Sequence, residues 1–232
     1  MTRSWPKVIL ASCLTILAAA TIFTGIRTVL FQPFRTNGVS MLPTVAHNDF
    51  TLVAKYSYGY SRYSIPFSPP LFSGRIFASE PERGDIVVYR LPKDNSADWF
   101  ARIVGLPGDR IRMNNGQLHI NGQPVPQVRV SDFIANEGLQ RQRIKRWRET
   151  LPNGTSYETL DLIERSFYDN TPEYLVPAGH YFMMGDNRDN ASDSRVLSAV
   201  GYVPFENLVG RVITVFLRTE SPGSPSEHAP KS

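Results

Sequence analysis

One serine in this chain has the surroundings expected of a nucleophile. Ser40 lies in the segment 34–44, Phe-Arg-Thr-Asn-Gly-Val-Ser-Met-Leu-Pro-Thr, a few residues beyond a long apolar stretch. A serine hydroxyl can attack a carbonyl carbon when a neighbouring base takes its proton. Taken alone, such a serine is more often a turn residue. Its place just behind an apolar stretch would put this chemistry at a membrane surface.

Two further segments concentrate charged side chains within turn-rich sequence. The first runs from Arg83 to Tyr89 and resumes at residues 99–109 as Trp-Phe-Ala-Arg-Ile-Val-Gly-Leu-Pro-Gly-Asp. The second, residues 184–195, reads Met-Gly-Asp-Asn-Arg-Asp-Asn-Ala-Ser-Asp-Ser-Arg. Acids and arginines this close together indicate an ion-pair network that holds a loop rigid. A charged loop on the surface is the alternative, and the sequence leaves it open.

The element that must position Ser40 is the apolar stretch before it. No residue from Val8 to Ile26 is charged, and the apolar run resumes at residues 29–31. At about 1.5 Å per residue, a helix of this length comes close to crossing the ~30 Å hydrocarbon core of a bilayer. We therefore predict a transmembrane anchor at residues 8–31, preceded by a cytoplasmic N-terminus at residues 1–7.

Three other interpretations of this stretch are weaker. The alanines at 18–20 have the small-x-small form of a signal-peptide cleavage site, but the sequence stays apolar beyond them, through Ile26. Residues 10–13, Leu-Ala-Ser-Cys, have the residue types of a lipoprotein signal, but too few apolar residues precede Cys13. A buried core helix would show caps and an amphipathic pattern, and this stretch shows neither.

Charge near the N-terminus sets the expected orientation. Arg3, Lys7 and the terminal amine should stay cytoplasmic, which places the rest of the chain outside the cytoplasm. Arg27 and Arg35 weaken this asymmetry, although an arginine at a helix end can snorkel. The net charge of +4 and the basic run at 141–148 indicate attraction to anionic lipid or, more simply, a solvated face. Outside the cytoplasm, no nucleic-acid partner is expected.

Beyond the anchor the sequence is typical of a folded, β-rich domain. Hydrophobic residues make up 41% of the chain and charged residues 20%, so a core can form. The single cysteine, Cys13, excludes an intrachain disulfide and a cysteine-based metal site. Short β-branched or aromatic runs separated by Gly, Pro and Asn turns occur at residues 51–54, 85–89, 102–104, 110–113, 118–120, 181–184 and 210–217.

We predict a mainly β fold, in which the N-terminal transmembrane helix is followed by an antiparallel β-rich catalytic core with a smaller inserted subdomain. The core is assigned to residues 32–112 and 178–217. The more polar stretch 113–177 is the predicted insert, with a helical piece near residues 132–148. The tail, 218–232, is rich in Pro, Ser and charge and is expected to be disordered.

Aromatic residues cluster between Tyr56 and Phe77, in a stretch whose prolines prevent regular structure. Such a loop can pack on its own domain. Alternatively, its rings can rest in the membrane interface, where amphipathic aromatic side chains are favoured. The sequence leaves both interpretations open.

In this order and behind an N-terminal anchor, the motifs resemble those of bacterial type I signal peptidases, the membrane proteases that remove signal peptides. The strings Ser-Met-Leu-Pro-Thr, Gly-Leu-Pro-Gly-Asp and Gly-Asp-Asn-Arg-Asp-Asn are highly specific when they occur together. The resemblance extends from about Val8 to Leu217. Residues 55–61, Lys-Tyr-Ser-Tyr-Gly-Tyr-Ser, look like the α-proteobacterial branch of that family.

The resemblance implies a serine endopeptidase that uses a Ser–Lys dyad at the outer face of the bacterial inner membrane. Ser40 would be the nucleophile, and its backbone N–H would help to bind the oxyanion. The family often has a hydroxyl two residues earlier, where this chain has Gly38. The family's lysine must be neutral to act as the base, so burial has to lower its pKa from about 10.4 towards neutrality.

This chain departs from the family pattern at two positions. The family's lysine directly precedes the arginine that leads into Gly-Leu-Pro-Gly-Asp, and that position here is Ala101, followed in register by Arg102. The serine that would hydrogen-bond the lysine is replaced by Ala191, with Ser192 displaced by one residue. Because the two missing groups would contact each other, their joint loss is typical of relaxed selection on one dyad.

The sequence identifies no replacement base. Arg102 keeps its proton, since the pKa of a guanidinium exceeds about 12. A histidine would need no large pKa shift, but each histidine here is more simply a surface or loop residue. The candidates are Lys93, His47, His119 and His180. Without a base, the precedent of other serine proteases indicates a loss of about 10⁴–10⁶ in turnover.

The rest of the family's machinery is matched residue by residue. By resemblance, the supporting residues are Arg102, Asp186, Asp193 and Arg195, with Arg102 paired to Asp186, and the pocket for Ala-x-Ala is lined by Phe34, Val88 and Phe100. Thr36 and Thr51 stand where the family has more apolar residues. No Cys, His and acid cluster with metal spacing and no phosphate loop occurs, so no cofactor is expected.

Two functions remain. In the first, Ser40 acyl transfer removes signal peptides from exported preproteins, with the lipid membrane and the export machinery as further partners. In the second, a pseudo-signal-peptidase binds signal peptides or a partner without cutting them. The family resemblance favours the first, while Ala101 together with Ala191 favours the second. A peptidase specialised for one pilus-like or conjugation substrate rests on analogy alone.

Overall fold

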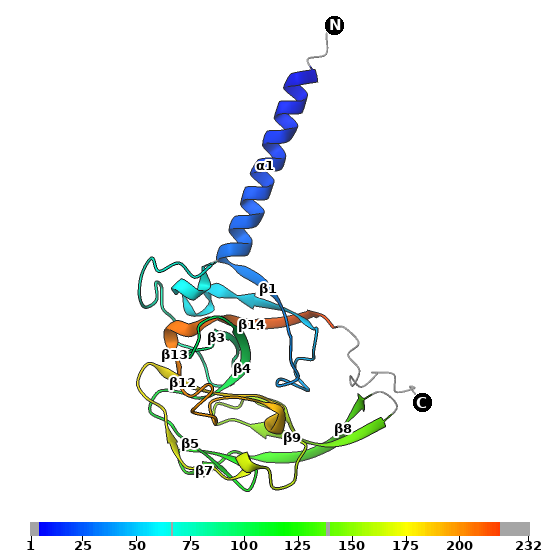
Figure 1. Cartoon of the computed structure of the whole chain (residues 1–232), viewed down its shortest axis with the longest axis vertical. Coiled ribbons are helices and arrows are strands. Elements are labelled where there is room, and N and C mark those ends of the chain that lie inside the picture. The colour runs from blue at the N-terminus through cyan, green and yellow to red at the C-terminus, as the bar shows by residue number, and fades with distance from the viewer. Residues whose placement is uncertain (1–4, 66, 138–139, 219–232) are drawn as a thin grey trace.

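A long helix stands apart from a body built of β-strands in the computed structural model, which describes residues 5–65, 67–137 and 140–218 (Figure 1). The helix is α1 (Trp5–Val29), and none of its apolar window Lys7–Ile26 is buried against the body. At 25 residues it is about 37 Å long, enough to cross a ~30 Å hydrocarbon core. With a mean hydropathy of 2.1 in that window, α1 fits the predicted single-pass anchor.

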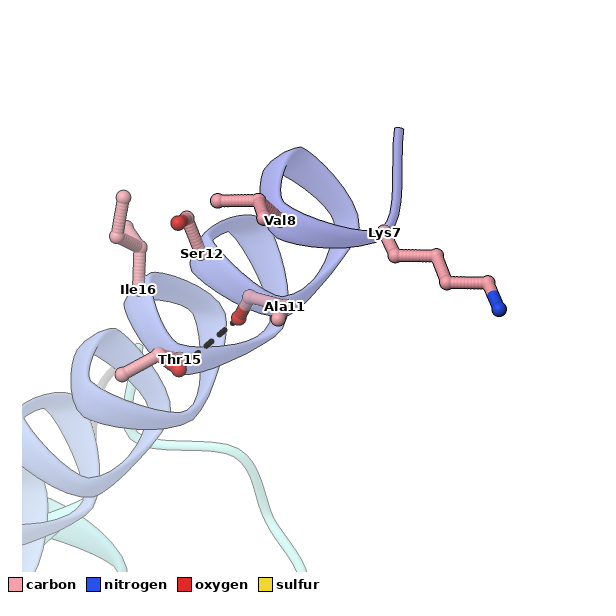
Figure 2. Close-up of a pocket in the computed structure, with 6 residues that line it drawn as sticks. All are labelled: Lys7, Val8, Ala11, Ser12, Thr15 and Ile16. Atoms are coloured by element: carbon pink, nitrogen blue, oxygen red, sulfur yellow. Dashed lines mark hydrogen bonds between the residues drawn. The ribbon is translucent and has the colours of Figure 1, made fainter. Parts of the chain in front are cut away.

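A recess of about 540 Å³ lies on this helix rather than on the body (Figure 2). Its lining residues are Lys7, Val8, Ala11, Ser12, Thr15 and Ile16. The Thr15 hydroxyl donates to the Ala11 carbonyl (2.9 Å), one turn earlier in the same helix, so that hydroxyl is already satisfied. All of the lining comes from α1, so lipid tails would fill this recess in a membrane.

The largest sheet of the body has seven antiparallel strands, in the order β1-β2-β14-β3-β4-β12-β13. Its strands come from both ends of the body sequence, so strands from the start and the end of the body lie side by side in one sheet. Their bounds are β1 (Phe31–Arg35), β2 (Phe50–Ala54), β3 (Ile86–Arg90), β4 (Asp98–Gly105), β12 (His180–Met184), β13 (Val203–Pro204) and β14 (Leu208–Leu217). The predicted antiparallel β-rich fold is confirmed.

The middle of the chain forms two smaller antiparallel sheets. The four-stranded sheet has the order β11-β5-β6-β7 and the three-stranded sheet the order β10-β9-β8. Their strands are β5 (Arg110–Asn114), β6 (Gln117–Ile120), β7 (Gln123–Pro124), β11 (Tyr174–Leu175), β8 (Gln127–Glu137), β9 (Gln140–Thr150) and β10 (Ser156–Asp161). The first of these sheets begins at Arg110, shortly before the expected start of the insert. The predicted tail lies almost entirely outside the described residues.

The helical piece predicted near residues 132–148 is wrong, because this stretch lies in the long hairpin of β8 and β9, which reaches away from the body (Figure 1). Phe133 pairs with Ile144 across the hairpin and both are buried, while the adjacent Arg143 is exposed. This alternation is the period of a half-buried strand. Polar residues on its outer face concealed it in the sequence.

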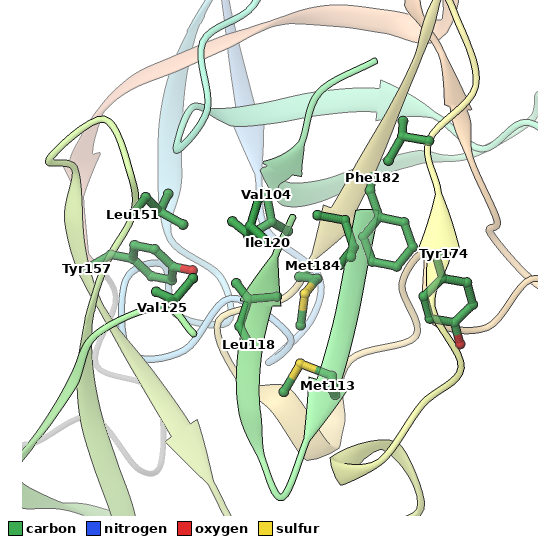
Figure 3. Packing of buried hydrophobic residues seen from close by; sticks show 12 residues of the cluster. Val104, Met113, Leu118, Ile120, Val125, Leu151, Tyr157, Tyr174, Phe182 and Met184 are labelled. Carbon is green, nitrogen blue, oxygen red and sulfur yellow. The ribbon is translucent and has the colours of Figure 1, made fainter. Parts of the chain in front are cut away.

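Hydrophobic packing joins the sheets along β12 and β4. Alternate residues of β12 point to opposite faces of the sheet, so Phe182 and Met184 enter one core cluster and Tyr181 and Met183 another. The first cluster lies against the four-stranded sheet, where Leu118 and neighbouring side chains surround it (Figure 3). The second lies on the sheet face that carries Ala101. β12 leads directly into the acid-rich segment, which is thereby fixed between two cores.

The aromatic loop is partly packed and partly exposed. Tyr58 and Tyr63 are buried, whereas Phe67 and Phe77 are largely exposed. The Arg75 guanidinium fastens the loop to the sheet, since it donates to backbone carbonyls on both sides. These carbonyls belong to Tyr58 (2.9 Å), Gly59 (2.9 Å), Phe205 (2.7 Å) and Leu208 (2.8 Å). The loop lies beside the foot of α1 (Figure 1).

Candidate active site

Ser40 sits in a turn that is held against the acid-rich segment by one asparagine. After β1 the chain leaves the sheet, and the Ser40 carbonyl accepts a hydrogen bond from the Asn187 backbone N–H (2.9 Å). The Asn187 side-chain amide donates to the Val39 carbonyl (3.0 Å). Met41, the next residue along the chain, is fully buried. The backbone around Ser40 is thus fixed on both sides.

The reactive groups of Ser40 itself carry no hydrogen bond within the part of the chain that the structure describes. Its hydroxyl has no partner there, and its backbone N–H donates to no described acceptor. An uncommitted amide at this place is available for an oxyanion, as the resemblance implied. At Gly38 an added Cβ would meet nothing within 4 Å, so the missing hydroxyl there reflects the sequence rather than a lack of room.

Ala191 and the Ser40 carbonyl meet at one glycine, Gly185. The pairing of β12 with β4 ends with Met184 opposite Arg102, and Ala101 is the neighbour of Arg102 on β4. A Cβ added at Gly185 would lie 2.4 Å from the Ala191 Cβ and 2.7 Å from the Ser40 carbonyl oxygen. Both alanines are buried. Two positions singled out in the sequence, Ser40 and Ala191, are therefore neighbours.

None of the four alternative bases is hydrogen-bonded to the Ser40 hydroxyl, because that hydroxyl has no partner among the described residues. Lys93 contacts the Ser198 carbonyl at the surface. The rings of His119, on β6, and His180, at the start of β12, each contact a carbonyl two residues earlier in the chain. His47 is half-buried in the turn that leads to β2.

Arg102 and Asp186 form a buried, two-pronged ion pair next to this site. Arg102 Nε donates to Asp186 Oδ1 (2.8 Å) and Nη2 donates to Oδ2 (2.6 Å), while Nη1 donates to the Gly84 carbonyl (2.8 Å). The guanidinium also stacks on the Tyr157 ring at 4.0 Å. Burial by itself would lower the pKa of Arg102, but the Asp186 carboxylate outweighs burial and raises it. Arg102 thus stays charged and cannot accept a proton.

Asp193 and Arg195 form a second buried pair, which fixes Gly185. Arg195 Nε donates to Asp193 Oδ1 and Nη2 donates to Oδ2, both at 2.8 Å. The Asp193 carboxylate also accepts the Gly185 backbone N–H (3.0 Å). The four acids and arginines that the sequence singled out are nearly fully buried. Their segment is a buried network and not an exposed charged loop.

Several residues of this region were given no individual role by the sequence analysis. Arg188 and Glu149 form a third buried pair (2.5 Å), and the Tyr157 hydroxyl donates to the same carboxylate (2.7 Å). The Thr44 hydroxyl donates to Asp186. The contact of Arg188 with Glu149 joins residues 39 positions apart and that of Thr44 with Asp186 joins residues 142 positions apart, so no local motif predicts either contact. The Ser-Met-Leu-Pro-Thr string did contain Thr44, but gave it no role.

The three pocket residues lie together on the opposite face of the sheet from Ala101. Val88 and Phe100 pair across β3 and β4, and the rings of Phe34 and Phe100 meet edge to face with centroids 6.2 Å apart. Phe34 and Phe100 are half-buried, which leaves part of each ring accessible. The Thr51 hydroxyl donates to the Phe34 carbonyl (3.3 Å). Thr36 is buried, and its hydroxyl has no described partner.

A second recess, of about 350 Å³, is lined in part by Pro43 and Thr44, which follow Ser40 in the chain. Its lining residues are Pro43, Thr44, Ile86, Arg102, Ser156, Tyr157 and Glu158. Arg102 is held there by Asp186, and Glu158 by Arg146 (3.1 Å) and Arg148 (3.1 Å). The charges around this recess are therefore already paired within the described chain.

The basic run also pairs with glutamates of the chain itself, Glu158 and Glu164, rather than with an external anion. Besides the two arginines on Glu158, Lys145 pairs with Glu164. Arg143 is exposed, and nothing is described of the Arg141 side chain. This favours the solvated-face interpretation. In the described residues no group of three or more His, Cys, Asp or Glu side chains is placed to hold a metal ion.

Comparison with known proteins agrees with the motifs. The family model described as signal peptidase, peptidase S26, matches residues 9–217. A signal peptidase I of Rickettsia typhi is 42% identical over 203 residues, covering 84% of this chain and 75% of that protein. A signal peptidase I of Rickettsia massiliae is 40% identical over 226 residues, covering 94% and 80%. These relatives come from the α-proteobacterial lineage that residues 55–61 resembled.

Among solved structures, a signal peptidase I of Enterococcus faecalis matches with a TM-score of 0.34 and 25% identity. The match covers 59% of this chain and 98% of that one. The sequence matches extend over the anchor, the Ser40 turn, both alanine positions and the acid-rich segment. The chain belongs to the signal peptidase family, peptidase S26, and is similar to signal peptidase I.

Proposed function

We propose that this protein binds the signal peptides of exported preproteins at the outer face of the bacterial inner membrane and that its ability to cleave them is severely impaired. The observation that carries the proposal is the Ser40 hydroxyl, which has no described hydrogen-bond partner, in a chain that has alanine at both positions of the expected base and its support. General acid–base catalysis contributes about 10²–10⁴-fold when the base is in place. Without the base, we expect the protein to keep its binding of signal peptides and to lose most of its ability to cleave them.

Retained binding elements support the first half of this proposal. The rings of Phe34 and Phe100 and the Val88 side chain form one apolar patch, suited to the small side chains of an Ala-x-Ala sequence. The uncommitted Ser40 N–H can donate to the carbonyl that would be cut. Neither element needs a lysine. Substrate recognition and proton transfer are thus separable in this site.

Membrane placement supports the same substrate class. The anchor ends at Val29, two residues before β1, so the body is kept close to the bilayer surface. The exposed Phe67, Leu71 and Phe77 lie in the loop beside the foot of α1, where they would contact the interface (Figure 1). With Arg3 and Lys7 cytoplasmic, the site lies outside the cytoplasm. A signal peptide that spans the same membrane would reach it with its C-terminal end.

Slow hydrolysis by Ser40 is the second candidate, favoured by the rigidity of its surroundings. The backbone of residues 39 and 40 is fixed by Asn187, and both buried ion pairs beside Gly185 are intact. A preorganised oxyanion donor alone gives residual catalysis over water. In this case the enzyme would be a signal peptidase I with low turnover.

The test uses the full-length protein in detergent micelles with a reporter preprotein. We expect wild type and Ser40→Ala to bind the preprotein equally and to differ little in cleavage. Replacing Ala101 by Lys together with Ala191 by Ser should raise cleavage on the order of 10²–10⁴-fold, the range of a positioned base. The matched control is Ala101→Met with Ala191→Ser, which restores length and hydroxyl but no amine.

The outcomes separate the two candidates. Efficient cleavage by wild type that is lost in Ser40→Ala would refute the impaired-turnover proposal and establish the peptidase. Absence of preprotein binding in wild type and Ser40→Ala alike would refute both. A gain in the methionine control equal to that of the lysine variant would show that packing, and not the amine, had been missing.

A further inference from the structure

The recess of about 350 Å³ lies where three parts of the fold meet. The large sheet contributes Ile86 and Arg102, the turn after Ser40 contributes Pro43 and Thr44, and β10 contributes its first three residues, 156–158. A hollow that several elements form next to a nucleophile is the usual kind of place for a ligand. The function proposed above gives this recess no role.

The recess shares a sheet face with the apolar patch of Phe34, Val88 and Phe100. Ile86 pairs with Arg102, and Val88 pairs with Phe100, across β3 and β4. Because side chains alternate between the two faces of a strand, these two pairs lie on one face, about 7 Å apart along the strands. An extended peptide covers the same distance with two residues.

The segment that carries Ser40 runs from the patch to the recess. It starts at Phe34, a patch residue, and ends at Pro43 and Thr44, which line the recess. Ser40 lies between these two ends. A peptide with Ala-x-Ala on the patch and its scissile carbonyl at Ser40 would therefore continue towards the recess with the residues that follow the cleavage site.

The wall of the recess and the Ser40 backbone are held by adjacent residues of one segment. The Thr44 hydroxyl donates to the Asp186 carboxylate, which also binds Arg102. The backbone N–H of the next residue, Asn187, donates to the Ser40 carbonyl (2.9 Å). The recess is thus fixed relative to the nucleophile, as a subsite for the same substrate has to be.

The charged groups around the recess leave one positive charge in excess. Arg102 is neutralised by Asp186. Glu158 is shared by two arginines, Arg146 and Arg148, each at 3.1 Å. The Arg148 side chain is 56% exposed, so its guanidinium is accessible to a carboxylate from outside. A substrate ammonium group at the same place would meet this excess of positive charge and be repelled.

We propose that this recess binds the first residues of the mature part of a preprotein, directly after the bond held at Ser40, and that it favours an acidic side chain there over a basic one. The inference rests on the proposed function, because the recess would extend the same binding site. It adds the mature sequence to the features by which substrates are selected.

The first measurement compares affinities for one reporter preprotein that carries Glu, Gln or Lys at its second mature position. The full-length Ser40→Ala protein in detergent is used, so that bound preprotein is not cut. We expect Glu to bind most tightly and Lys least, with Kd values that differ on the order of fivefold at low ionic strength. Added salt should reduce the difference, because exposed charges are screened.

Two arginine variants test the source of this preference. In Arg148→Gln the Glu and Lys preproteins should bind with nearly equal affinity, because Glu158 then balances Arg146 alone. The matched control is Arg143→Gln, which removes the same charge from an exposed position of the same strand, β9. Residue 143 lies an odd number of positions from 148 and thus on the other face, so this variant should keep the preference.

Disulfide cross-linking tests the location directly, in a Cys13→Ser background that removes the single native cysteine. Ser156→Cys, in the recess lining, should cross-link to a preprotein cysteine at the second mature position and not to one at the third residue before the cleavage site. Ser198→Cys is the control. It is exposed and precedes Ala199 and Val200, which pack on the Ala101 face of the sheet.

The outcomes separate the inference from the function on which it rests. Equal affinities for Glu, Gln and Lys, or a preference that survives in Arg148→Gln, would overturn the role of charge. Cross-linking of Ser156→Cys to the residue before the cleavage site, or equal cross-linking of Ser198→Cys, would overturn the location. In these cases the preprotein still binds and the proposed function stands. Absence of binding by every preprotein would refute the proposed function and this inference with it.

Discussion

The buried charges around Gly185 and the reactive position beside them are built in opposite ways. Arg102 with Asp186 and Arg195 with Asp193 satisfy one another in two-pronged pairs, and backbone groups take up further hydrogen bonds. Ser40, a few ångströms of packed backbone away, has a hydroxyl with no described partner. In the first region the charges are compensated within the described chain, whereas the second region has a hydroxyl without a described partner.

This contrast shows that the buried ion pairs beside Gly185 are complete without a lysine at position 101. A buried ion pair is required by the fold as soon as it exists, because removal of one partner leaves an uncompensated charge. A lysine that must be neutral contributes no such requirement. An alanine can stand in its place at little cost to folding, so the ion-pair network can be kept where the base is absent.

Breaking the buried ion-pair network should have the largest effect on the free energy of unfolding. Arg102→Met leaves the Asp186 carboxylate buried and unpaired, and we expect the free energy of unfolding to fall by about 3–5 kcal/mol. The matched control is Arg110→Met, which removes an ion pair with Glu173 in which both side chains are well exposed. It should change stability by at most about 1 kcal/mol. Urea denaturation of the full-length protein in detergent measures both.

The comparison would fail if the two variants lost equal stability. Burial of the ion pairs would then make no difference to their contribution to stability. The comparison would instead be sharpened if Arg102→Met lost much stability and this loss disappeared when Asp186→Asn was added. That result would assign the loss to the orphaned carboxylate rather than to lost packing on Tyr157.

Crowding at Gly185 should give the next largest effect. Gly185→Ala adds a methyl group that would meet both the Ala191 Cβ (2.4 Å) and the Ser40 carbonyl oxygen (2.7 Å). We expect a loss of about 1–3 kcal/mol, the range of overpacked cores. Combining it with Ala191→Gly should recover only part, since the contact with Ser40 remains. Because Ser40 is displaced, preprotein binding should weaken in step.

Gly38→Ala provides the matched control on the other side of Ser40. Its added methyl group meets nothing within 4 Å, so the substitution should be neutral or stabilise by up to about 1 kcal/mol. Equal losses for the two glycine variants, from thermal unfolding at one detergent concentration, would contradict the close packing of Ala191 and Ser40 on Gly185.

How much of this could be read from the sequence depends on how local each feature is. The strand runs at 85–89, 110–113 and 118–120 correspond closely to β3, β5 and β6, because a continuous apolar run marks β3 and apolar alternation marks β5 and β6 within a few residues. The predicted helical piece near residues 132–148 falls in the hairpin of β8 and β9, because many residues there are polar and the apolar pattern of a strand is not visible.

The site divides along the same line. Short motifs located Ser40, Asp186 and Arg195, because their spacing is local. The clamp by Asn187 and the pair of Arg188 with Glu149 join distant segments, so no pattern within either segment predicts them. Tyr89 escaped notice for a different reason. A tyrosine within a strand is ordinary, and only the finished core shows that its hydroxyl has no partner.

The smallest effect, and the one of opposite sign, should come from Tyr89→Phe, which removes a buried hydroxyl on β3 that has no described partner. Since the hydroxyl is buried and unpaired, its removal should leave stability unchanged or raise it by about 1 kcal/mol. Tyr58→Phe removes a hydroxyl of the same kind that donates to Asp85, and it should cost about 1–3 kcal/mol. A substantial loss in Tyr89→Phe, measured beside Tyr58→Phe in one urea series, would mean that this phenol is already satisfied in the resting protein. In that event the Tyr89 hydroxyl would belong with the compensated network, and Ala101 would lie outside that network.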